Sequence, residues 1–149
     1  MILVRWIIAL AFTAVFASAT LAQTPEGWAL IARTKFDAKY NEKAGEYFLY
    51  PTFPEELKAK VGKELILEGY YLPLDIEGGG YIILSKFPYA QCFFCGGAGP
   101  ESIVEVTFKG KQPKFEADQY IRVSGKLKLN EGDIDHGNFL LEEASLIEK

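Results

Sequence analysis

The chain of 149 residues is poor in the residue types on which most catalytic and metal sites depend. It has two cysteines and one histidine, His136. A nucleophile triad would have to use His136, and nothing near it has that pattern. A usual structural zinc site needs two Cys-x-x-Cys pairs, and this chain has one. Because Gly-x-Ser-x-Gly and P-loop motifs are also missing, we expect a protein that is not an enzyme.

Basic residues are also scarce relative to acidic ones. Lys and Arg number 16 against 20 Asp and Glu, which gives a net charge of −4. Recognition of a phosphate backbone needs clustered Lys and Arg, so the balance argues against nucleic acid as a partner. The lysines and glutamates are interspersed along the chain, as on a solvated surface.

A long apolar run is absent after residue 22, and the one at the start has the order of a secretory signal peptide. Arg5 supplies a positive charge, residues 6–16 are almost entirely apolar, and small residues continue to Ala22. This apolar core is shorter than the ~20 residues of a membrane-spanning helix. We therefore expect residues 1–22 to be a signal peptide, cleaved after Ala22 or, alternatively, after Ala19.

The mature chain, residues 23–149, is then expected to be a single β-rich domain exported to the bacterial periplasm or cell envelope, without a membrane anchor. Removal of Arg5 takes away one base and no acid, so the net charge changes from −4 to −5. An oxidising compartment lets disulfides persist.

Alternating apolar and polar residues predict a chain made mostly of strands. Two strands, at 29–40 and 46–52, form a predicted hairpin over 29–52. A short helix over 54–61 begins at Pro54 and places Leu57 and Val61 on one face. Five further strands are expected in a barrel over 63–148, at 64–74, 81–87, 102–108, 120–129 and 138–147.

Gly69 lies in the middle of the first of these five strands and indicates a bend, as at a barrel corner. The expected fold is mainly β, a small five-stranded barrel of the oligonucleotide/oligosaccharide-binding (OB) type preceded by the hairpin and the short helix. A β-sandwich of the same strands is the alternative.

The segment Cys92–Pro100 holds both cysteines and is followed by a predicted strand. A disulfide between Cys92 and Cys95 that locks this loop is the first interpretation. The two thiolates would alternatively bind Zn or Cu, with His136 as a weak extra ligand. A thiol–disulfide redox site is the third interpretation, although the glycines and proline after Cys95 oppose the helix that such a site needs.

Neighbours of the cysteines are candidates for contact with a ligand or partner. Phe93 and Phe94 either pack against the end of the barrel or form an exposed aromatic lip. Gly96 and Gly97 complete this candidate contact set. We therefore expect a binding module for a small ligand or an envelope protein, with no cofactor unless the metal interpretation holds.

Three segments together resemble a known family. Gly69-Tyr70-Tyr71-Leu72-Pro73-Leu74-Asp75, the loop from Cys92 to Pro100 and Ile103-Val104-Glu105-Val106 are similar, in this order, to exported bacterial proteins with the domain of unknown function DUF3299. The likeness covers residues 54–108. In the loop this chain has Phe93-Phe94-Cys95-Gly96-Gly97 where the family has a proline-rich stretch, and this loop and the Leu21-Ala22-Gln23 junction resemble members from the Bacteroidetes lineage. The resemblance implies export and a compact β-rich fold, and it implies no activity.

Overall fold

The computed structural model describes residues 27–74 and 79–147. The predicted signal peptide, part of the turn after Leu74 and the last two residues lie outside this part of the chain. None of the helices within the described residues is both long and apolar enough to cross a membrane.

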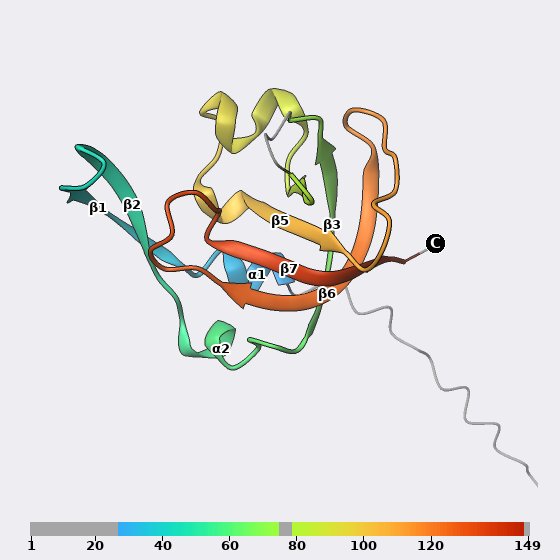
Figure 1. Cartoon of the computed structure of the whole chain (residues 1–149), viewed down its shortest axis with the longest axis horizontal. Helices are drawn as coiled ribbons and strands as arrows, with labels where there is room; N and C mark the ends of the chain where they lie inside the picture. Colours follow the sequence, from blue (N-terminus) through green and yellow to red (C-terminus); the bar gives the residue numbers. More distant parts are fainter. Residues whose placement is uncertain (1–26, 75–78, 148–149) are drawn as a thin grey trace, which may run out of the picture.

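Five strands close into a barrel, as Figure 1 shows. They are β3 (Glu64–Leu72), β4 (Ile82–Ser85), β5 (Ile103–Phe108), β6 (Tyr120–Leu129) and β7 (Phe139–Leu146). Their order is β3-β4-β5-β7-β6, and β3 also pairs with β6. The β5–β7 pair is parallel and the other four pairs are antiparallel. The predicted OB-like barrel is confirmed, and closure excludes the two-sheet sandwich.

The barrel interior is filled by residues that alternate along each strand. On β6, Ile121, Val123 and Leu127 are buried, and the lysines on either side of Leu127, Lys126 and Lys128, are exposed. They pack with buried residues of the other strands, among them Leu67, Leu84, Val106 and Leu141. Successive side chains of a strand point to opposite faces, so this alternation places one face of β6 inside the barrel.

A short helix, α1 (Gly27–Ile31), precedes the hairpin. Trp28 and Ile31 are three residues apart, lie on one face of the helix and are both buried in the main core. The Trp28 indole Nε1 also donates a hydrogen bond of 2.7 Å to the Glu68 carbonyl of β3. The strand predicted over 29–40 is therefore wrong for its first residues, because burial of Trp28 and Ile31 favours a helical turn there.

The hairpin consists of β1 (Lys35–Asn41) and β2 (Glu46–Thr52), paired antiparallel, and it projects from the barrel (Figure 1). At its base Phe36 and Phe53 contact the ring of Phe139 edge to face, with ring centres 6.4 and 5.6 Å apart. At its tip Asn41 Oδ1 accepts hydrogen bonds from two turn N–H groups. The hairpin is thus held by aromatic contacts at its base and by hydrogen bonds to the Asn41 side chain at its turn.

The second helix, α2 (Glu55–Lys58), is shorter than predicted. Leu57 is fully buried, but Val61 is 48% exposed. The expected shared face of these two residues is wrong, because the helix ends before Val61 and the chain turns there.

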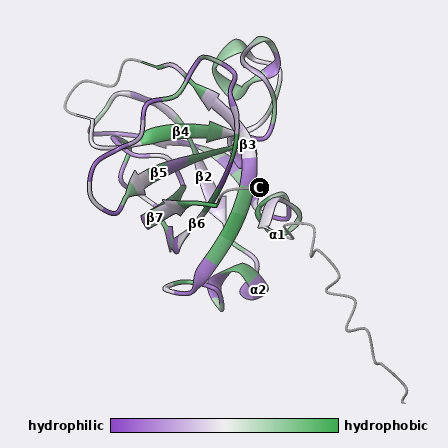
Figure 2. Cartoon of the chain, turned by 90° about the vertical axis from the view of Figure 1, so that its right-hand side faces the viewer, coloured by the Kyte–Doolittle hydropathy of each residue, from purple (hydrophilic) through white to green (hydrophobic). Residues whose placement is uncertain are grey.

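A second, smaller apolar cluster lies on the outside of the barrel. It contains the buried residues Leu72, Ile83 and Cys92, with Leu74, Tyr81 and Ile103 packed against them. All four residues of β4 are buried, and Figure 2 shows this strand as hydrophobic along its length. One face of β4 fills the barrel and the other is covered by the cysteine segment, which explains its continuous apolar run.

Candidate functional site

The loop between β4 and β5 is built from three short 3₁₀ turns, Tyr89–Gln91, Phe93–Cys95 and Pro100–Ser102. The Cys92 carbonyl accepts hydrogen bonds from the N–H groups of Cys95 and Gly97, both at 3.2 Å. Gly96 has a φ of 75°, in the left-handed region. A Cβ on Gly97 would lie 2.8 Å from the Gln91 carbonyl oxygen. The two glycines therefore close this loop.

The two cysteines have different surroundings. Cys92 is fully buried in the outer cluster, whereas Cys95 is exposed. Both are free thiols, and the Cys92 thiol donates to Cys95 Sγ over 3.5 Å, while the Cys95 thiol donates to the Tyr89 carbonyl over 3.1 Å. The hydrogen bond with Cys92, followed by burial, raises the pKa of the Cys95 thiol. A raised pKa lowers the thiolate fraction, which is the reactive form.

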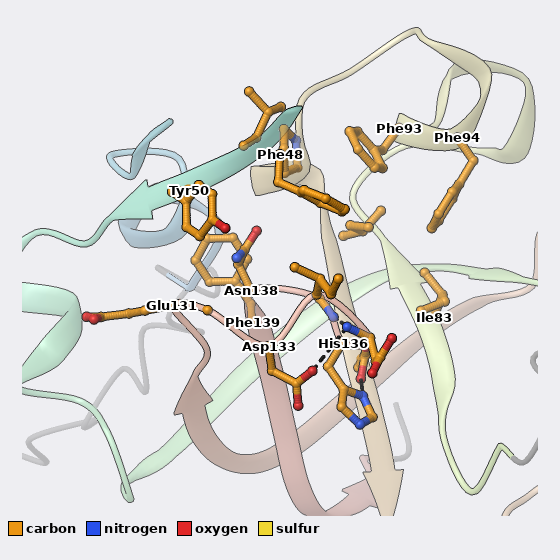
Figure 3. Close-up of a pocket in the computed structure, with 18 of the residues that line it drawn as sticks. Phe48, Tyr50, Ile83, Phe93, Phe94, Glu131, Asp133, His136, Asn138 and Phe139 are labelled. Atoms are coloured by element: carbon orange, nitrogen blue, oxygen red, sulfur yellow. Dashed lines mark hydrogen bonds and ion pairs between the residues drawn. The ribbon is translucent and has the colours of Figure 1, made fainter. Parts of the chain in front are cut away.

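A pocket of about 630 Å³ lies between this loop, the hairpin and the outer face of the barrel. Figure 3 shows Phe48 and Tyr50 of β2 on one side, Phe93 and Phe94 on another, and His136 below. The lining comprises Tyr47–Tyr50, Leu74, Tyr81, Ile83, Phe93, Phe94, Pro100, Ile103, Glu105 and the continuous segment 131–139. Segments far apart in sequence thus converge on one hollow.

The phenylalanines between the cysteines form one wall of the pocket. Their rings meet edge to face with centres 5.3 Å apart, and Phe94 is 53% exposed. Both residues and His136 line the pocket, whereas Cys92, Cys95, Gly96 and Gly97 are not among its lining residues. Of the predicted contact set, the aromatic pair therefore faces the pocket and the glycines shape the loop behind it.

The floor of the pocket carries a polar pair formed by a β5 residue and a residue of the β6–β7 loop. Glu105 of β5 is 5% exposed, and its Oε2 lies 3.0 Å from His136 Nδ1 in the β6–β7 loop. The other carboxylate oxygen, Oε1, accepts a hydrogen bond from the Gly137 N–H. Glu105 thus fixes the loop that closes the pocket from below.

Tyr81 completes this polar floor. Its ring centre is 5.8 Å from that of His136. Burial, and then the charge of Glu105, raise the pKa of the Tyr81 hydroxyl. The protonated hydroxyl can donate a hydrogen bond.

No pattern in the sequence placed Glu105 or the hairpin residue Phe48 in a site. Glu105 could have been recognised from the sequence, because a carboxylate between Val104 and Val106 on a largely apolar strand is unusual inside a fold. Only the folded loop shows that this carboxylate is covered and paired.

No three His, Cys, Asp or Glu residues in the described part of the chain are grouped so that they could hold one metal ion. His136 pairs with Glu105, and the two cysteines contact each other.

Fold and site together define a small closed β-barrel of the OB type with an aromatic pocket on its outer face. No protein-family model and no curated protein matches the chain. Among solved structures it is similar to a DUF3299 family protein from Pseudomonas aeruginosa PAO1, determined by crystallography, with 21% sequence identity and a TM-score of 0.45. The match covers 66% of this chain and 68% of the other. This solved structure is of the same family that the sequence resembles.

Proposed function

We propose that the protein is an exported, non-catalytic binding module of the cell envelope. The pocket between the hairpin, the cysteine loop and the β6–β7 loop would hold a small ligand with an apolar surface. The observation that carries this proposal is the pocket itself, about 630 Å³ and rich in aromatic side chains around a few polar groups. Ligand sites typically have this size and composition.

The position of the pocket supports the same function. OB barrels bind ligands on the face of their second and third strands and beside the loop between their fourth and fifth strands. Here these are β4, β5 and the β6–β7 loop, and each contributes lining residues. This support is an analogy between folds, so the test must come from the pocket residues.

We further propose that Cys92 and Cys95 form a disulfide in the exported protein and so lock the wall that carries Phe93 and Phe94. The sulfur atoms are 3.5 Å apart, within reach of a bond after a small movement. A disulfide-bearing oxidant of the envelope would take up the two electrons and two protons. The raised pKa of Cys95 disfavours a redox-exchange enzyme, whose attacking thiol needs a lowered pKa.

Mass spectrometry of the mature protein, purified from the envelope without reductant or chelator, tests the disulfide. We expect a mass two hydrogens below that of the reduced chain. The Cys95→Ser variant should then lose about 2 kcal/mol of unfolding free energy relative to the oxidised protein, the loss expected for opening so small a loop. With reductant present, wild type and variant should have nearly equal stability.

Two results would contradict the disulfide. A reduced mass with a metal adduct that disappears on denaturation would favour the Zn or Cu interpretation. A reduced mass without an adduct would mean that both cysteines are free thiols. The loop would then be held by the packing of Cys92, without a covalent bond.

Fluorescence of N-phenyl-1-naphthylamine, an uncharged aromatic probe that becomes bright in apolar surroundings, tests the pocket. We expect saturable binding that weakens roughly five- to tenfold in Phe94→Ala, because one aromatic contact is lost. Tyr120→Ala is the matched control, since Tyr120 is 47% exposed and does not line the pocket. Equal affinities of both variants and wild type would reject the pocket as the binding site.

A further inference from the structure

We infer that the pocket selects an organic cation, an ammonium group with apolar substituents; this inference rests on the proposed function and names its ligand class. Seven of the lining residues are Tyr or Phe, and four are acidic. Neither Lys nor Arg occurs among the described residues that line the pocket. Aromatic faces combined with carboxylates are the surroundings in which proteins hold alkylated ammonium groups.

The two lysines whose pKa values respond to carboxylates of the lining have their main ion pairs elsewhere. Lys58 and Lys128 each form an ion pair outside the pocket, with Glu55 at 3.0 Å and Glu142 at 2.8 Å. The pKa of Lys58 is raised first by Glu55 and last by Glu131, and that of Lys128 first by Glu142 and last by Asp133. The main partners of both lysines are therefore carboxylates that do not line the pocket.

The four carboxylates that line the pocket differ in the hydrogen bonds that they already accept and in their orientation. Glu105 is held by His136 and the Gly137 N–H. Glu131 points away from the phenylalanines in Figure 3. Asp133 accepts a hydrogen bond from the Asp135 N–H. Asp135 is exposed and lines the pocket, so it is the carboxylate best suited to a test.

One ring of the pocket already has a cation beside it. Lys39 of β1 places Nζ 5.9 Å from the centre of the Tyr50 ring. The Tyr50 hydroxyl accepts a hydrogen bond of 2.9 Å from Asn41 Nδ2, which fixes the ring. The pocket lining therefore includes an aromatic ring held in place within cation–π distance of a charged group.

Two matched pairs of probes separate the effect of charge from that of shape. Choline and 3,3-dimethyl-1-butanol have the same branched end, and only choline is charged. Benzyltrimethylammonium and phenylacetate add an aromatic ring with opposite charges. Each would be titrated by calorimetry into the mature wild-type protein, at low and at physiological salt, beside the naphthylamine probe.

We expect each cation to bind at least tenfold more tightly than its neutral or anionic counterpart, with weaker binding at higher salt. Asp135→Asn should reduce cation affinity about two- to fivefold, because one charge near the ligand is removed. It should leave binding of the uncharged naphthylamine probe unchanged. Glu116→Gln is the control, since Glu116 also carries an exposed carboxylate but does not line the pocket.

The results distinguish failure of this inference from failure of the proposed function. Equal affinity for choline and 3,3-dimethyl-1-butanol, or tighter binding of phenylacetate than of benzyltrimethylammonium, would overturn selection of a cation, while naphthylamine binding would still support a binding module. If neither the naphthylamine probe nor any cation binds, both proposals are overturned.

Discussion

Replacing Gly69 with alanine is expected to destabilise the protein by about 2–3 kcal/mol, as overpacking of a well-packed site does. Strand β3 pairs with β6 through residues 64–70 and with β4 through residues 70–72, so Gly69 lies where it passes from one partner to the other. A Cβ there would lie 2.3 Å from the Ser85 carbonyl oxygen and 3.1 Å from its carbon. Because backbone atoms cannot move aside as a side-chain end can, β3 and β4 would have to separate.

Urea unfolding of the mature protein measures this loss. Gly80→Ala is the matched control, because no heavy atom lies within 4 Å of a Cβ at that position. We expect the control to change stability by no more than about 1 kcal/mol. Equal unfolding midpoints for Gly69→Ala and wild type would show that the barrel does not need this close approach.

Replacing Phe139 with alanine is expected to have the larger effect, about 3–5 kcal/mol, the usual cost of removing a buried phenylalanine. Phe139 is 1% exposed and opens β7. Its ring contacts Phe36 of the hairpin and Phe53, and it also lines the pocket. The substitution therefore removes the contact that joins the hairpin to the barrel.

Two measurements separate loss of stability from release of the hairpin. Urea unfolding reports the first, and the rate of tryptic cleavage at Lys43, in the hairpin turn, reports the second. Phe139→Leu keeps much of the volume and should lose less than half as much stability. If the alanine variant is cleaved at the wild-type rate under native conditions, the Phe139 ring does not hold the hairpin in place.

The barrel could be predicted because apolar and polar residues alternate along its strands. Strand β6 was expected at 120–129 and is found there, since Ile121, Val123 and Leu127 alternate with charged residues. Helix α1 was missed for the opposite reason. A helix of five residues is too short to show a helical period, and the residues after Trp28 also fit an alternating pattern.

The site could be predicted only in part. Phe93 and Phe94 were expected either to pack against the end of the barrel or to form an exposed aromatic lip, and both line the pocket. The pairing of Glu105 with His136 joins residues 31 apart. It depends on how β7 runs parallel to β5 and brings the preceding loop over the outer face, and no local pattern records that arrangement.

The apolar residues are divided into an interior cluster and an outer cluster, and this division affects which substitutions such a protein can accept during evolution. The interior cluster of Leu67, Leu84 and Val123 fills the barrel, while Ile83 lines the pocket and packs with Leu72 and Cys92 in the outer cluster. Substitutions in the outer cluster are therefore expected to change the shape of the pocket more than the packing inside the barrel. The shape of the pocket and the packing of the barrel interior can thereby change separately within one small domain.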